Sequence, residues 1–251
     1  MNEENFITAK NKVIGISRER HGIGTQREKT VHAVLKYYYA PDEDMHEIPI
    51  DSYIADIYTG REIIEIQTAQ MYRMRGKLEC FLSQYPVTIV HPIPRYKWLS
   101  WIDTDTGECS GLRKSPKKGS VYQVFGELYR IRAFLNHENL RFCFPFIDIE
   151  EYRLLNGWSH NKKRGSERYD RIPVALKDEV RIDCKEDYLQ FIPYELPEPF
   201  TSAELAQATK IRRRDATVVL NVLNHVGAVK RVGKKGHNYT YTVNSKESTY
   251  E

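Results

Sequence analysis

Apolar positions recur at two spacings along the chain, and each spacing predicts a different kind of element. Val31, Val34, Leu35 and Tyr38 form one stripe at helical spacing, which predicts an amphipathic helix that begins near Thr25. The same criterion predicts further helices within residues 70–83, 120–135, 200–210 and 211–227. Alternating or short apolar runs predict strands at 52–58, 61–68 and 87–93, a hairpin within 96–112, and a strand from 140 that enters a short helical segment before 155. The pattern therefore predicts an α/β protein with a mixed central sheet flanked by helices.

Proline content and charge divide the chain into segments. Three prolines fall within residues 193–199, a composition that excludes a helix interior or a central strand and predicts a linker. We expect a large domain at 1–157, a basic segment and Pro-rich linker at 158–199, and a small domain at 200–247. The segment before the linker, residues 161–176, is predicted to be an exposed basic loop that leads into another helix or strand.

Composition narrows the class of protein further. The 251 residues carry a formal net charge of +4, and the sequence has no apolar run near the roughly 18 residues that a membrane-spanning helix requires. The first residues are polar and include acids, unlike a signal or transit peptide. The four cysteines form no CxxC pair, which argues against a structural zinc site. These features predict a cytoplasmic protein without a membrane partner.

Positive charge is concentrated near the C-terminus. Between Ser202 and Val243 there are eight Lys or Arg residues and two acids, which suggests a polyanionic partner. Two predicted helices and a hairpin around residues 233–238 resemble a winged helix-turn-helix, a fold that places its second helix in the major groove of DNA. The resemblance implies that these residues contact DNA: Arg212, Arg213, Arg214, Lys230, Arg231, Lys234, Lys235 and His237. The alternative is a winged helix that mediates contacts between proteins.

Candidate chemistry lies in the predicted hairpin of residues 52–68. If Thr59 and Gly60 form a two-residue loop, Asp56 pairs with Ile63 and lies on the same face as Glu65, on a diagonal of about 7–8 Å. Two carboxylates at that separation can share a cation. A register shift of one residue would put Glu65 on the opposite face and separate them. The alternative is that Glu65 is a solvent-facing strand residue and Asp56 a turn-flanking acid.

The order of these elements resembles the PD-(D/E)XK nuclease superfamily, whose core has the order αβββαβ. The resemblance covers residues 12–94: a helix with Glu28, a strand with Asp56, a strand with Glu65-Ile66-Gln67, a helix and an apolar strand. It implies a restriction-endonuclease-like fold. It also implies that Asp56, Glu65 and the backbone carbonyl of Ile66 hold Mg²⁺ or Mn²⁺, and that cleavage leaves 5′-phosphate ends.

The sequence departs from this superfamily at one catalytic position. Gln67 occupies the place of a lysine, and an amide can bind a water molecule but carries no positive charge. Glu28 occupies the place of a further acid in resolvase-like members, although Thr25-x-x-Glu28 also matches a helix capping box. His32, one turn later, is either a partner of the acids or an ordinary helix residue.

Two functions follow from these patterns. The first is a metal-dependent DNA endonuclease of restriction, repair or defence, in which Asp56, Glu65, Gln67 and Glu28 act at the catalytic site. The second is a nuclease-like protein that has lost catalysis and binds DNA or regulates another process. A homodimer would suit cleavage of both strands, but the sequence does not require one.

Overall fold

The computed structural model describes residues 2–20, 30–158 and 164–244, with side chains for 2–15, 30–156 and 167–244. The chain clusters into two compact units. Unit 1 comprises residues 1–68, 90–120 and 144–180, and unit 2 comprises residues 69–89, 121–143 and 181–251. The predicted boundary at residue 158 therefore falls inside unit 1.

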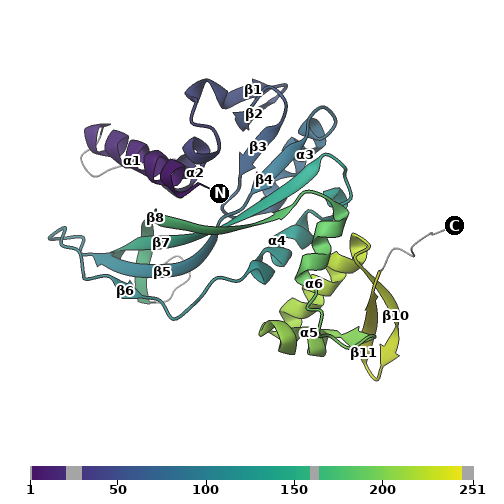
Figure 1. The fold of residues 1–251 in the computed structure, drawn as a ribbon. Helices are drawn as coiled ribbons and strands as arrows, with labels where there is room; N and C mark the ends of the chain where they lie inside the picture. Colours follow the sequence, from purple (N-terminus) through teal and green to yellow (C-terminus); the bar gives the residue numbers. More distant parts are fainter. Residues whose placement is uncertain (1, 21–29, 159–163, 245–251) are drawn as a thin grey trace. The chain divides into compact units, whose positions relative to one another are not determined.

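Both units contain helices and strands (Figure 1). The α-helices are α1 (Glu3–Arg20), α2 (Thr30–Tyr39), α3 (Arg75–Phe81), α4 (Phe125–Arg130), α5 (Ser202–Thr209) and α6 (Arg213–His225). The strands are β1 (His46–Ile50), β2 (Tyr53–Tyr58), β3 (Ile63–Ile66), β4 (Val87–Val90), β5 (Ile93–Ile102), β6 (Arg113–Lys114), β7 (Leu140–Trp158), β8 (Arg164–Ile182), β9 (Phe200–Thr201), β10 (Val229–Lys235) and β11 (Asn238–Val243). The 3₁₀ helices are η1 (Glu43–Met45), η2 (Met71–Met74), η3 (Val121–Val124), η4 (Arg132–Phe134) and η5 (Lys185–Phe191).

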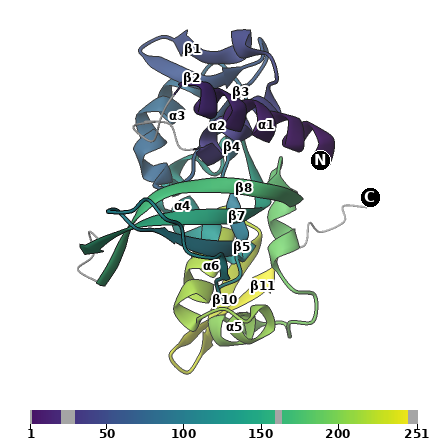
Figure 2. The same cartoon turned by 90° about the vertical axis from the view of Figure 1, so that its left-hand side faces the viewer.

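The larger sheet is mixed, as predicted. Its strand order is β1-β2-β3-β4-β7-β5-β6, and β8 pairs with β7. β1, β2 and β3 are antiparallel neighbours, whereas β5 and β7 are parallel. α1 and α2 pack together, and α2 also contacts β3 (Figures 1 and 2). The protein is thus a mixed α/β fold with helices flanking a central sheet.

The β2–β3 hairpin has a different register from the one predicted. Tyr58 pairs with Ile63 and Ile57 with Ile64, so the connection comprises four residues, Thr59 to Glu62, and not two. The register is shifted by two residues, and a shift of two preserves the face on which each side chain lies. Asp56 and Glu65 consequently stand directly opposite each other instead of on a diagonal.

Several other predictions need correction. α1 occupies an N-terminal stretch for which no element was predicted, and it buries Phe6, Ala9 and Val13. The helix predicted at 70–83 is split into η2 and α3. β7 continues as a strand through the segment predicted to turn helical, because alternate residues such as Ile147, Ile149 and Glu151 are buried along it. From Arg164 onward the predicted basic loop is strand β8.

The C-terminal part of unit 2 follows the predicted order of elements. Thr201 caps α5 through a capping box with Glu204, and Gly227 follows α6 with a φ of 81°. The strands β10, β11 and β9 form a three-stranded antiparallel sheet. Residues 193–199 form neither helix nor strand, as the proline content predicts.

Candidate functional site

Asp56 and Glu65 form a reciprocal pair across two neighbouring strands. Glu65 Oε1 accepts a hydrogen bond from the backbone N–H of Asp56 at 3.2 Å, and Asp56 Oδ2 accepts one from the backbone N–H of Ile66 at 2.8 Å. Each carboxylate is therefore held by a donor on the opposite strand. We call these two residues the acidic pair.

Glu65 is buried and Asp56 is half-buried because of where their strands lie. All four residues of β3 are buried, since this strand is in the interior of the sheet, and Glu65 is only 3% exposed. The Asp56 side chain retains 21% of its exposure. Two carboxylates in such surroundings are costly unless hydrogen bonds or a cation compensate them, and the backbone donors supply part of that compensation.

His32 contacts the acidic pair from α2. Its Nε2 lies 3.1 Å from Asp56 Oδ2. An ionised carboxylate only accepts hydrogen bonds, so with Asp56 ionised His32 Nε2 is the donor in this contact. The first of the two interpretations of His32, a partner of the acids, is the one that the structure bears out.

The backbone of Gln67, two residues after Glu65, is held by contacts with Val90 and His91. Gln67 N–H donates to the Val90 carbonyl at 2.9 Å, and the Gln67 carbonyl lies 2.5 Å from Nδ1 of His91. His91 was missed by sequence reasoning, because it only reaches Gln67 through the pairing of β3 with β4. Glu28 and Thr25 lie outside the described residues.

The donor chemistry of the acidic pair fits a small hard cation. Mg²⁺ is commonly held by one or two carboxylates while it keeps several waters and binds substrate phosphate. Among the described residues no group of three or more His, Cys, Asp or Glu side chains is arranged to hold a metal ion.

Eight cationic or imidazole side chains predicted to contact DNA are exposed and lie in unit 2. They are Arg212, Arg213, Arg214, Lys230, Arg231, Lys234, Lys235 and His237. Three of them have polar partners there: Arg212 bonds Asp215, Arg213 bonds Asn238, and Lys235 Nζ lies 4.0 Å from Glu204. Arg212–Arg214 stand at the start of α6, whereas the other five stand on or between β10 and β11.

Two cations of the hairpin stack on an aromatic ring. The Arg231 guanidinium is 3.8 Å from the centroid of the Tyr239 ring, and Lys234 Nζ is 5.0 Å from it. Arg231 lies closer to the ring than Lys234, and a planar guanidinium can stack on a ring face. The hairpin therefore presents exposed positive charges, two of which lie over an aromatic ring.

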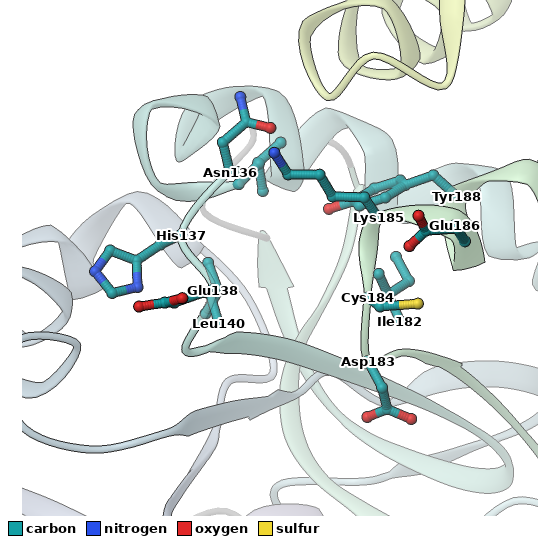
Figure 3. A pocket seen from close by; sticks show the side chains of 11 residues that line it. Asn136, His137, Glu138, Leu140, Ile182, Asp183, Cys184, Lys185, Glu186 and Tyr188 are labelled. Carbon is teal, nitrogen blue, oxygen red and sulfur yellow. The ribbon is translucent and has the colours of Figure 1, made fainter. Parts of the chain in front are cut away.

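A separate pocket of about 660 Å³ lies within unit 2 (Figure 3). His137 and Glu138 stand on one side of it and Cys184, Glu186 and Tyr188 on the other. Burial raises the pKa of Tyr188, and its hydroxyl has no hydrogen-bond partner in the part of the chain that the structure describes. Neither member of the acidic pair lines this pocket, so the two sites are distinct.

Comparison with known proteins gives a family but no activity. An uncharacterized protein of Treponema pallidum (strain Nichols) is 28% identical to the chain over 227 residues, which cover 87% of this chain and 86% of that protein. No solved structure matches the chain. No helix in the described ranges has the length and apolar character to cross a membrane. A family model, described as a domain of unknown function (DUF8091), matches residues 29–183, which include the acidic pair, and the chain belongs to this family.

Proposed function

We propose that the protein is a metal-dependent DNA endonuclease and that the acidic pair is its catalytic centre. The observation that carries this proposal is the directly opposed placement of the half-buried Asp56 and the buried Glu65 on β2 and β3. A sheet has little structural use for two opposed carboxylates, one of them fully inside it, because each must be compensated. A divalent cation would compensate the two negative charges and could also take part in phosphodiester hydrolysis.

The order of elements around the pair supports a PD-(D/E)XK, restriction-endonuclease-like core. α2, β1, β2, β3, α3 and β4 follow one another in the order αβββαβ, and the four strands are neighbours in the sheet. Asp56 and Glu65 fall on the second and third of these strands, where the resemblance expects the two acids. Fold alone does not establish activity, so the proposed activity depends on Asp56 and Glu65 themselves.

The proposed site assigns a role to each residue. Asp56, Glu65 and the carbonyl of Ile66 would hold Mg²⁺ or Mn²⁺, which when bound supplies an activated water and positive charge at the phosphate. His32 fixes the orientation of the Asp56 carboxylate through Nε2. The Gln67 amide can bind and orient a water molecule, but it adds no charge to stabilise the transition state.

The C-terminal segment would deliver the catalytic core to DNA. α5, α6 and the β10–β11 hairpin have the order of a winged helix-turn-helix, and the start of α6 carries three consecutive arginines. Clustered cations on one helix end and one hairpin match the pattern that neutralises backbone phosphates. We further propose that the protein acts in the cytoplasm, that cleavage leaves 5′-phosphate ends, and that a two-fold dimer would cut both strands.

The alternative is a nuclease-like DNA-binding protein without catalysis. The amide of Gln67 at the lysine position favours it, since part of the electrostatic stabilisation is missing. The contact between His32 and Asp56 also provides the acid with a partner other than a metal. This alternative shares the DNA contacts of the first proposal and differs only in turnover.

The experiment that tests the proposal is a cleavage assay. The purified full-length protein is incubated with supercoiled, linear and branched DNA in Mg²⁺, Mn²⁺ or EDTA. Cutting that requires the metal supports the endonuclease. Retarded DNA on a gel without any cutting supports the alternative.

A further inference from the structure

Four cationic side chains of unit 1 surround the carboxylate of Glu151. Arg153 donates from Nε to Glu151 Oε1 at 2.8 Å, and Arg171 donates from Nε to Oε2 at 2.9 Å. Lys97 Nζ and Arg168 Nε lie 3.9 and 4.0 Å from Oε2. We call these five residues the Glu151 cluster. They come from β5, β7 and β8, which run side by side (Figures 1 and 2).

The cluster has more positive than negative charge. Its single carboxylate faces four cations, so the five side chains carry three net positive charges. Burial lowers the pKa of Lys97, and burial together with the neighbouring Arg171 lowers the pKa of Arg168. Like charges held together in a partly dehydrated place are unfavourable unless an anion joins them.

The Glu151 cluster is open to solvent on the side of its cations. The Glu151 side chain is completely buried, whereas the side chains of Arg153 and Arg168 are 33% and 45% exposed. In the described part of the chain, Arg168 makes no hydrogen bond, and Arg171 uses only Nε for its bond to Glu151. A guanidinium has five N–H donors, so most donors of these two arginines remain available to an external acceptor.

The strand register places Lys97, Glu151 and Arg153 on one face of the sheet. Glu151 pairs with Leu99 in the parallel β5–β7 ladder, and Lys97 and Arg153 are each two residues from that pair, on the same face. Glu151 thus serves as an internal anchor that orders two arginines, while the surplus charge points outward. This differs from a chain of exposed ion pairs, in which charges balance.

We infer that the Glu151 cluster binds backbone phosphates of double-stranded DNA. This inference rests on the proposed function and extends it by naming a substrate contact in unit 1. A phosphodiester carries one negative charge, so three surplus charges match successive phosphates of a polyanion better than one small anion. Ordered guanidinium groups with free N–H donors provide the planar, charge-assisted contacts that phosphates accept.

The test uses the full chain in EDTA, so that cleavage does not enter. Binding of a fluorescein-labelled 20-base-pair duplex is measured by anisotropy between 50 and 200 mM NaCl. The variant is Lys97→Gln with Arg168→Gln, because neither residue makes a short bond to Glu151 and both removals leave its two arginine bonds intact. The matched control is Lys177→Gln on the same strand as Arg168; within the described ranges, the ion pair of Lys177 is with Glu3.

We expect the double variant to bind the duplex about tenfold more weakly at 100 mM NaCl, with a salt slope reduced by about 1–2, while the control matches the wild type. Unchanged affinity and slope in the double variant would overturn the inference. A rise in melting temperature with inorganic phosphate, together with unchanged DNA affinity, would also overturn it in favour of a small-anion site. If the wild type never cuts DNA but the double variant still binds the duplex more weakly than the wild type, the result would support the phosphate contact of the Glu151 cluster and contradict the endonuclease.

Discussion

Asp56 and Glu65 stand directly opposite each other on β2 and β3, and the backbone N–H of Asp56 donates to Glu65 Oε1 at 3.2 Å. The Asp56 carboxylate in turn accepts from the strand that carries Glu65. Both acids accept hydrogen bonds from backbone N–H groups, and the amide oxygen of Asn or Gln can accept the same bonds. Substitution by Asn or Gln therefore removes the negative charge while retaining the hydrogen bonds, whereas substitution by Ala removes both.

The first prediction concerns metal binding. Mg²⁺ at 5 mM should raise the melting temperature of the wild type by a few degrees, because a ligand that binds only the folded state stabilises it. Asp56→Asn combined with Glu65→Gln should abolish that rise. Differential scanning calorimetry measures both. An equal rise in the double variant would show that the metal binds elsewhere.

The second prediction concerns His32 as a positioning residue. His32→Gln should raise the Mg²⁺ concentration for half-maximal cleavage by about 10–100-fold, since it removes the partner that orients Asp56. The maximal rate at saturating metal should recover in part. The concentration series is repeated for His46→Gln, whose ring instead contacts the Ala40 carbonyl. A similar rise in His46→Gln would assign the effect to general destabilisation.

The third prediction concerns DNA binding by unit 2. Arg214→Ala with Lys230→Ala in the full chain should weaken duplex binding and reduce its salt slope by about 2, because both side chains are exposed. Truncation after Pro199 is a poorer test, since α6 packs against α4 and its removal would expose the core. Equal salt slopes in variant and wild type would favour a protein-binding role for this segment.

The fourth prediction concerns acid stability. Burial opposes ionisation of Glu151, but the hydrogen bond from Arg153 and the charge of Arg171 outweigh it and lower the pKa of Glu151 to about 2. A depressed pKa stabilises the fold above the unfolded-state value of 4.5. This stabilisation should disappear as the pH falls from about 4.5 to 2. Thermal melts between pH 7 and 2.5 should show a smaller acid-dependent loss for Glu151→Gln than for the wild type, and equal losses would contradict the assignment.

The acidic pair could be found from the sequence because strand alternation tolerates an error of two residues. The hairpin loop was predicted too short, yet Asp56 and Glu65 remained on one face. The order of the C-terminal elements was predicted, because Thr201, Glu204 and Gly227 are local signals of helix ends.

Features that depend on contacts between residues far apart in the sequence could not be predicted. The Glu151 cluster joins residues of β5, β7 and β8, and Arg171 lies 20 residues from Glu151, to which it donates a hydrogen bond. No local sequence pattern therefore predicts the cluster. The C-terminal half of β7 was expected to be helical, but its neighbours in the sheet impose an extended conformation. Among its described side chains, residues 3–15, α1 buries a narrow stripe of Phe6, Ala9 and Val13 within a polar sequence, which is a weak signal of a helix.

The most direct test of the central claim is the rate of DNA cleavage by Glu65→Gln, with Glu62→Gln on the same hairpin as the matched loss of charge. We predict that Glu65→Gln lowers the Mg²⁺-dependent rate at least about 100-fold while duplex affinity in EDTA stays at the wild-type level. Glu62→Gln should cleave at the wild-type rate. Cleavage by Glu65→Gln at the wild-type rate would contradict the assignment of the acidic pair as the catalytic centre.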